Sequence, residues 1–266
     1  MPSSVTGAAG NAVAAEQVAS AWLDALIRLA TLAPVGWYHE HGGAVAAVSG
    51  ANFSSLNTAV SLDPELELAS LDEAAAEVAA LGLPWSITVR GTAGTAVTAL
   101  AAEHGLTDRD ELPLMVCAAE GAVLYTDKSL RRVIRPVGSV ASSTYTEILT
   151  SGFGVPDGAF GTLMGGGLLD ARGIAGYLAK VSGRYAATSL GITSGRFLGV
   201  YNIAVIPGAR LQGIGRAMTA RVMADGFAAG ADTAYLQTSA EGRPLYESMG
   251  FRLAENWTIF SGSAAC

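Results

Sequence analysis

The chain has few cysteines, few charges and few basic residues, and each shortage excludes a class of protein. Two cysteines, Cys117 and Cys266, cannot form a disulfide framework, so we expect a reducing compartment, the cytoplasm. The 16 lysines and arginines are outnumbered by 23 acidic residues, and a net charge of −7 argues against a nucleic-acid partner. No uncharged apolar run approaches the roughly 20 residues of a membrane span, so no membrane partner is expected.

Apolar residues, in contrast, are abundant. Half of the 266 residues are hydrophobic and only 15% are charged, which is sufficient for a sizeable core. The length suits one large domain or two of about 130 residues each. Because the pattern of strands and helices restarts after Asp127, we predict two domains, residues 1–127 and 128–266.

Hydrophobic periodicity predicts both helices and strands. The helices are expected at residues 11–33, 71–81, 93–104, 142–150, 213–229 and 243–248. The strands are expected at residues 43–49, 57–62, 85–89, 112–118, 123–125, 130–137, 176–181, 184–190, 197–205, 234–238 and 251–260. Ser70 is predicted to cap the second helix. Residues 152–167 are predicted to be a loop, whose part Gly161–Gly167 is either a mobile lid or flexible filler.

The two halves repeat each other weakly. Leu100, Gly105 and Leu106 stand in the same relation as Leu245, Gly250 and Phe251, an offset of 145 residues that places Ala101 opposite Tyr246. Two identities and one similar residue indicate either a duplicated fold or chance, and the sequence alone does not separate the two.

Residues 202–217 read as a buried strand, a glycine-rich turn and a helix. Gly213 and Gly215 let the backbone approach a ligand closely, and the first N–H groups of a helix have no partner within it. Arg210 and Arg216 add cationic donors. The stretch therefore predicts a phosphate-binding turn, although a turn with glycines for compactness gives the same pattern.

Two other phosphate-binding motifs fit less well. A dinucleotide fold needs a third glycine where this chain has Met218, which argues against a nicotinamide-dependent oxidoreductase. A P-loop ends in Gly-Lys-Ser/Thr, and here the residues are Gly215, Arg216 and Ala217.

The stretch 202–217 resembles motif A of the Gcn5-related N-acetyltransferases (GNAT), R/Q-x-x-G-x-G/A, filled by Arg210, Gly213 and Gly215. Residues 245–251, LYESMGF, are similar to the family's motif B. The resemblance covers about residues 130–266, and the first half looks like the degenerate N-terminal copy of two-domain members. It implies an α+β fold with tandem GNAT-like domains, each a mostly antiparallel mixed sheet flanked by helices.

The resemblance also implies an activity and its residues. The expected reaction is transfer of an acetyl group from acetyl-CoA to a primary amine of a small molecule or peptide, by direct attack. The backbone of Ile203, Ala204 and Val205 would pair with the pantetheine arm, and the Val205 N–H would polarise the acetyl carbonyl. Tyr246 would be the general acid for the departing thiolate. The pyrophosphate would be held by Arg210, Leu211, Gln212, Gly213, Ile214, Gly215 and Arg216.

The sequence leaves the activity, the oligomeric state and the general base open. A catalytically silent acyl-CoA sensor would keep the same fold, and Tyr246 could be a core aromatic residue instead of an acid. The first half lacks motif A and is acidic over 63–70, so we expect no coenzyme there. Monomer and homodimer are both compatible with the sequence. Candidate general bases, none of them at a family position, are Glu147, Asp157, Asp170, Glu241 and Glu255.

The three histidines lie in the first half. His39 and His41 are expected in a loop, solvated and without a metal, and His104 is expected to have a structural role at a helix end.

Overall fold

The chain forms a sheet of 11 strands within the residues that this computed structural model describes, 5–63, 65–161 and 163–262. The strand order is β1-β2-β3-β4-β11-β5-β10-β9-β8-β7-β6. The bounds are β1 Trp37–His41, β2 Ala44–Val48, β3 Asn57–Ser61, β4 Ser86–Arg90, β5 Asp108–Ala118, β6 Ile134–Val137, β7 Ile174–Val181, β8 Arg184–Ser194, β9 Phe197–Val205, β10 Thr233–Gln237 and β11 Arg252–Ser261.

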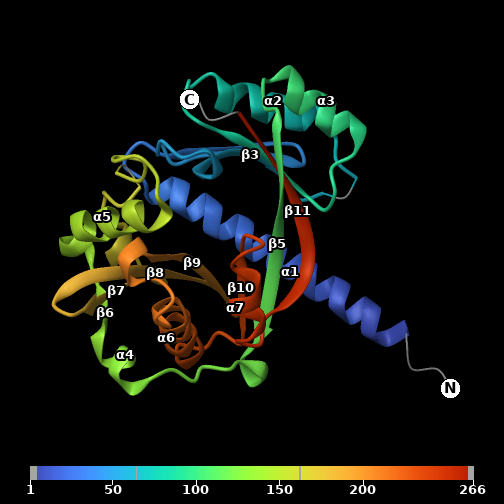
Figure 1. Cartoon of the computed structure of the whole chain (residues 1–266). Coiled ribbons are helices and arrows are strands. Elements are labelled where there is room, and N and C mark those ends of the chain that lie inside the picture. Colours follow the sequence, from blue (N-terminus) through green and yellow to red (C-terminus); the bar gives the residue numbers. More distant parts are fainter. Residues whose placement is uncertain (1–4, 64, 162, 263–266) are drawn as a thin grey trace.

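Helices cover both faces of this sheet (Figure 1). Helices α1 and α5 pack on one face, where Trp22 of α1 meets Trp257 with ring centroids 4.8 Å apart. Helices α2, α3, α6 and α7 lie on the other face. Their bounds are α1 Val5–Leu32, α2 Leu68–Ala79, α3 Thr95–Glu103, α4 Lys128–Val133, α5 Ser142–Phe153, α6 Ile214–Ala228 and α7 Arg243–Glu247. The mixed α+β class expected from the sequence is thus confirmed.

The two halves of the chain exchange their last strands. Strand β5 from the first half pairs with β10, and β11 from the second half pairs with β4. The two exchanged strands pair antiparallel with each other and run through the middle of the molecule (Figure 1). Strands β1 to β4 and then β11 follow one another from one edge of the sheet. Strands β7 to β10 and then β5 follow in the same way from the other, apart from the extra edge strand β6.

The weak repeat seen in the sequence has a structural counterpart. Parallel strands β3 and β4 flank α2 in the first half, as β9 and β10 flank α6 in the second. Gly105 and Gly250 each precede an exchanged strand and each has a positive φ, 76° and 95°. Such angles favour glycine, which explains why these positions agree at the offset of 145.

Most predicted elements are present, but several predictions were wrong. Of the strand expected at 130–137, only residues 134–137 form one, β6, and residues 130–133 belong to helix α4, whose start the Asp127 side chain caps by accepting from the Ser129 N–H. Residues 123–125 form no strand. Ser70 is not the cap of α2, since Glu67 precedes the helix and the buried Ser70 hydroxyl donates to the Glu67 carboxylate.

Strand β1 was missed because it lies at the sheet edge and is largely exposed, so it carries no apolar alternation. His39 and His41 therefore lie on a strand and not in a loop.

The glycine-rich segment after α5 packs partly against the first half of the chain. Phe160 is 3% exposed and lies against Phe53 of the first half, with ring centroids 4.9 Å apart. The Asn52 N–H donates to the Ala159 carbonyl at 3.0 Å, and Leu163 and Met164 are also buried. One residue of this segment, 162, lies outside the described residues. The segment thus joins the two halves.

No helix within the described ranges combines the length and the apolar character that a membrane crossing requires.

Candidate active site

The site begins where two parallel strands stop pairing. Strands β9 and β10 are in register only over residues 197–199 and 233–235. In the first half, β3 and β4 stay paired over residues 58–61 and 86–89, which reaches the carboxyl end of β3. The last residues of β9 therefore have no described strand partner on the β10 side, although β8 still pairs on the other.

A β-bulge marks the point of divergence. The pairing of β8 with β9 shifts between Thr188 and Leu190, opposite Asn202. Asn202 has φ 53°, a left-handed conformation that asparagine tolerates better than most residues. The Thr188 hydroxyl donates to the Asn202 carbonyl at 2.8 Å and holds this conformation. The sequence reading did not single out Asn202 as the cause of a bulge.

The end of β9 presents the Val205 amide away from β8. The Ile206 N–H donates to the Ala186 carbonyl at 3.0 Å, so by strand alternation the preceding N–H faces the opposite side, where β10 has diverged. The Val205 carbonyl accepts from Arg210 Nε at 3.1 Å. Arg210 Nη2 also donates to the Gly152 carbonyl of α5 at 2.9 Å.

Arg210 thus ties the end of β9 to α5 through two of its five N–H donors, and its expected role as a phosphate donor stays a prediction. Gly152, which the sequence reading missed, lets α5 approach β9: a β-carbon there would lie 3.1 Å from the Val205 nitrogen. The sequence placed Gly152 in the loop 152–167, whereas helix α5 extends to Phe153 and includes it.

The turn before α6 forms a cradle of backbone N–H groups. Leu211 and Gly213 have φ 61° and 76°, and helix α6 starts with the Ala217 N–H donating to the Gly213 carbonyl. Within the described part of the chain, the N–H groups of residues 211–216 have no acceptor. They lie at the positive end of a 15-residue helix, an arrangement that suits a phosphate.

Helix α7 lies against this cradle. A β-carbon on Gly215 would contact Val205 Cγ2 at 3.8 Å and Leu245 Cδ2 at 3.9 Å. Arg216 Nη1 donates to the Ser248 hydroxyl at 2.7 Å, and its Nη2 donates to the Ser248 carbonyl at 3.2 Å. The structure therefore brings together the two sequence motifs, and Arg216, like Arg210, has its guanidinium on protein acceptors.

Tyr246 of α7 is half-buried, and its ring packs edge-on against Phe251 with centroids 5.8 Å apart. Burial raises the pKa of the Tyr246 phenol to about 12, so the hydroxyl keeps its proton at neutral pH. The described residues include no hydrogen-bond partner for this hydroxyl. It remains available as a donor to a ligand.

Three of the five candidate bases have structural partners. Hydrogen bonds from its own backbone N–H and from the Ser239 side chain lower the pKa of Glu241. The Glu255 carboxylate accepts from Arg90 Nε at 2.8 Å and from the Trp257 indole. Asp170 accepts from the Ser139 N–H at 3.1 Å. Among the described residues, no hydrogen bond links Glu147, Asp157 or Glu241 to Tyr246.

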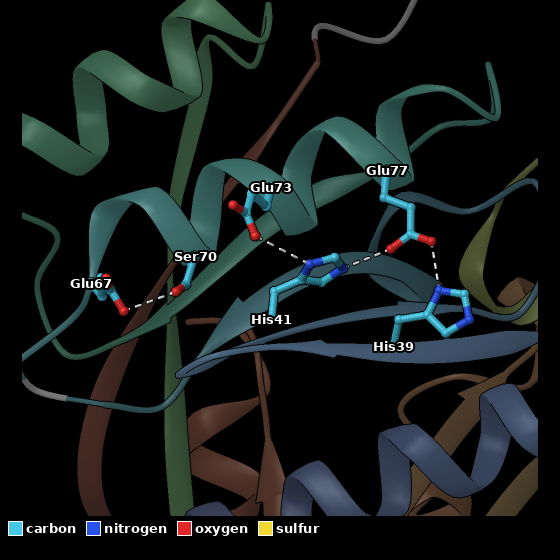
Figure 2. Close-up of polar contacts among 6 residues, drawn as sticks. All are labelled: His39, His41, Glu67, Ser70, Glu73 and Glu77. Atoms are coloured by element: carbon cyan, nitrogen blue, oxygen red, sulfur yellow. Dashed lines mark hydrogen bonds and ion pairs between the residues drawn. The ribbon is translucent and has the colours of Figure 1, made fainter.

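The histidine pair lies on β1, at the opposite end of the sheet from β8 and β9. Both rings point toward Glu77 of α2 (Figure 2). The Glu77 carboxylate contacts His41 Nε2 at 2.8 Å and His39 Nδ1 at 2.5 Å, and Glu73 lies 3.6 Å from His41 Nδ1. Burial of Glu77 opposes ionisation, but the hydrogen bonds from His41 and His39 outweigh it and lower its pKa. The described residues contain no group of three or more side chains suited to a metal ion. His104 pairs with Asp72 at 2.7 Å, a structural contact.

A known protein family matches the part of the chain that contains β9, the turn before α6 and α7. Residues 169–253 match the family model "Acetyltransferase (GNAT) domain". No curated protein matches the sequence.

Solved structures resemble the chain over nearly its whole length at low identity. A GCN5-related N-acetyltransferase from Kribbella flavida has a TM-score of 0.65 at 17% identity, covering 94% of this chain and 96% of its own. A putative GNAT acetyltransferase from Novosphingobium aromaticivorans has a TM-score of 0.58 at 18% identity, with 90% and 97% covered. A tandem GNAT protein from the clavulanic acid biosynthesis pathway has a TM-score of 0.50 at 13% identity, with 84% and 79% covered. The chain thus has the GNAT fold, and its residues 169–253 match the model of the GNAT acetyltransferase domain.

Proposed function

We propose that the chain is an N-acetyltransferase that uses acetyl-CoA as donor and a primary amine of a small molecule or peptide as acceptor. One observation carries the proposal: the unpaired end of β9, the cradle of N–H groups without described acceptors and helix α7, which bears Tyr246, lie side by side. A phosphate cradle alone would suit many ligands. The adjoining strand edge and the Tyr246 hydroxyl also match a thioester joined to a pyrophosphate by an extended arm.

Each element has a role in the proposed binding. The N–H groups of residues 211–216 bind the pyrophosphate, and the helix dipole of α6 adds to their effect. The free edge of β9 at Ile203 and Ala204 hydrogen-bonds the amides of the pantetheine arm, as a strand would. Arg210 and Arg216 also hold β9, α5 and α7 in position around the cradle.

The chemistry follows from charge development. Attack of the neutral amine on the thioester carbon places negative charge on the carbonyl oxygen, which the Val205 N–H stabilises. The C–S bond then breaks, and the Tyr246 hydroxyl donates to the thiolate sulfur. With a pKa of about 12, Tyr246 is a strong hydrogen-bond donor but a reluctant acid, so the proton shifts fully only once negative charge has formed on sulfur. The ammonium formed on the acceptor loses its proton to water.

We propose further that residues 1–127 are a structural copy without a coenzyme site. Strands β3 and β4 stay paired where β9 and β10 diverge. The turn before α2 is acidic, with Asp63 accepting from the Glu65 N–H, so it would repel a phosphate. The negative charge of the chain, −7, favours a cationic amine as acceptor by electrostatic steering.

Calorimetric titration with acetyl-CoA tests the binding part of the proposal. We expect one site per chain, with NAD giving no heat of binding. Two acetyl-CoA molecules per chain would contradict a silent first half. Binding without thiol release in the presence of amines would indicate a sensor instead of an enzyme.

A further inference from the structure

A side-chain bridge joins β9 and β10 at the point where their backbone pairing ends. The last pair in register is Gly199 with Tyr235, and Tyr201 lies two residues farther along β9. The Tyr201 hydroxyl donates to the Tyr235 hydroxyl at 3.0 Å, and the two rings meet edge-on with centroids 6.1 Å apart. The two strands are therefore still joined through side chains where the backbone bonds between them have stopped.

This bridge continues into the first half of the chain. The Tyr235 hydroxyl donates to the Ala21 carbonyl of α1 at 2.9 Å. A carbonyl can only accept, so the single proton of the Tyr235 hydroxyl is used there, and Tyr201 must be the donor to Tyr235. The order of donors is thus fixed, from Tyr201 of β9 through Tyr235 of β10 to helix α1.

Gly199 leaves the room that the bridge needs. A β-carbon at this position would clash with the Tyr201 ring and would stand 2.8 Å from the Tyr235 hydroxyl oxygen. Tyr235 is fully buried and belongs to the same core cluster as Trp22 of α1 and Leu114 of β5. Burial raises the pKa of both phenols well above the usual range, so both hydroxyls keep their protons in neutral and mildly alkaline solution.

Tyr201 also adjoins the bulge of β9. It pairs with Leu190 of β8, and the register of the two strands shifts directly after this pair, opposite Asn202. The residues that follow, Ile203 to Val205, are those proposed to face the pantetheine arm and the thioester. Tyr201 is thus held from two sides, by the backbone of β8 and by the bridge to β10, just before the end of β9 diverges.

We infer that Tyr201 and Tyr235 are positioning residues of the proposed transferase: their bridge to α1 sets the separation of β9 and β10 and so holds the Val205 N–H in place. The inference rests on the proposed function, because that function places the thioester between these strands. It also gives the first half of the chain a part in the reaction other than coenzyme binding. Helix α1 is the fixed end of the bridge, and its Asp24 carboxylate is tied to β8 by accepting from the Ser194 hydroxyl at 2.9 Å.

Phenylalanine variants of the full chain test the inference, because each removes one hydroxyl and keeps the ring. Tyr201→Phe removes the bond between the strands and leaves Tyr235 bonded to Ala21. We expect it to lower kcat about tenfold in a thiol-release assay, since a small misplacement of the reacting groups is costly, and to change the KM for acetyl-CoA by about twofold at most. Tyr235→Phe removes both bonds of the bridge, so the double variant Tyr201→Phe/Tyr235→Phe should lose no more kcat than Tyr235→Phe alone.

Hydrogen exchange measured by NMR gives a readout that does not depend on activity. The Ile206 amide, which donates to the Ala186 carbonyl at the end of β9, should exchange about fivefold faster in Tyr201→Phe, the effect of one lost hydrogen bond on local opening. Tyr177→Phe is the matched control, since the Tyr177 hydroxyl also donates to one side chain, Asp225 at 2.8 Å, but lies on β7, beyond β8. It should lower the melting temperature to a similar extent and change neither kcat nor the exchange of Ile206.

If Tyr201→Phe kept the wild-type kcat or the wild-type exchange rate of Ile206, the inference would be overturned. An equal loss of kcat in Tyr177→Phe would overturn it as well. Should Tyr235→Phe not fold, Tyr201→Phe decides the matter by itself, because it leaves the buried bond to Ala21 intact. No acetyl transfer by the wild type would instead reject the proposed function, whereas faster exchange of Ile206 in Tyr201→Phe and not in Tyr177→Phe would still support the hold of the bridge on β9.

Discussion

Gly152 of α5 lies against the backbone of Val205, so close that a β-carbon would stand 3.1 Å from its nitrogen and 2.8 Å from Ala204 Cβ. The Val205 N–H is the group proposed to stabilise the carbonyl oxygen, and α5 therefore fixes its position. Arg210 strengthens the contact by joining the carbonyls of both residues.

Gly152→Ala should push the end of β9 away from α5. Overpacking of this kind costs about 1–3 kcal/mol of unfolding free energy. We expect a lower melting temperature and, at a temperature where the variant is folded, a lower kcat in a thiol-release assay.

Gly208→Ala is the control, because a β-carbon there meets nothing within 4 Å and its φ is not positive. Equal melting temperatures and equal kcat values for Gly152→Ala and wild type would refute the positioning role.

Gly213→Ala should damage the cradle through backbone strain. Its φ of 76° is costly for a residue with a side chain, by about 1–2 kcal/mol. Gly215→Ala should leave the stability unchanged, because its β-carbon would make ordinary contacts of 3.8 and 3.9 Å.

Chemical denaturation of both variants checks this difference. If Gly215→Ala lost as much unfolding free energy as Gly213→Ala, the backbone conformation described for this turn would be contradicted.

Tyr246→Phe should lower kcat on the order of 100-fold, because the thiolate loses its hydrogen-bond donor. The affinity for coenzyme A should change less than twofold, since the ring and its packing on Phe251 remain. Because burial raises the pKa of the phenol to about 12, its ionisation should not reduce the wild-type rate below about pH 11.

Steady-state kinetics from pH 6 to 10, with calorimetric affinities, measure both effects. A large loss of affinity with unchanged kcat would assign Tyr246 a binding role instead.

Much of this site could be predicted from the sequence, because local signals carry it. Gly213 and Gly215 mark the turn, and the apolar run 197–205 marks a buried strand, which the structure confirms as β9. Asn202 was harder to interpret, since its bulge depends on the partner strand β8 and not on its own neighbours.

The contacts of Arg210 and Arg216 were beyond sequence reasoning. Each bonds to carbonyls that are distant in the chain, at Gly152 and at Tyr125, and local patterns carry no signal for such pairs. The strand exchange was missed for the same reason, because an alternating pattern such as that of β5 indicates a strand but not its neighbours.

A fragment of residues 128–266 should not fold by itself. Without β5, strands β10 and β11 lose their shared neighbour and expose unpaired edges. Circular dichroism and size-exclusion chromatography should show an unfolded or aggregated fragment, and co-expression with residues 1–127 should restore solubility. A well-folded, coenzyme-binding fragment would contradict this interdependence.

Glu77→Gln should lower stability slightly at neutral pH, by about 0.5 kcal/mol, because its partly exposed contacts to His39 and His41 are screened by solvent. The pKa of Glu77 is lowered in the folded state, so its contribution is present above the ordinary value of 4.5 and is lost as pH falls below it. The melting temperatures of variant and wild type should therefore differ at pH 7 and converge near pH 3.

Glu73→Gln, which alters a longer contact of 3.6 Å at a more exposed carboxylate, should have a smaller effect at every pH. If the difference in melting temperature between Glu77→Gln and wild type grew as the pH fell, it would contradict a lowered pKa of Glu77 in the folded protein.

The most direct test of the whole account is a thiol-release assay with acetyl-CoA against a panel of amines, comprising polyamines, aminoglycosides and peptides. The account predicts release that depends on the amine, yields the N-acetylated product by mass spectrometry and falls sharply in Tyr246→Phe. Tight binding of acetyl-CoA with no amine-dependent release for any member of the panel would contradict it.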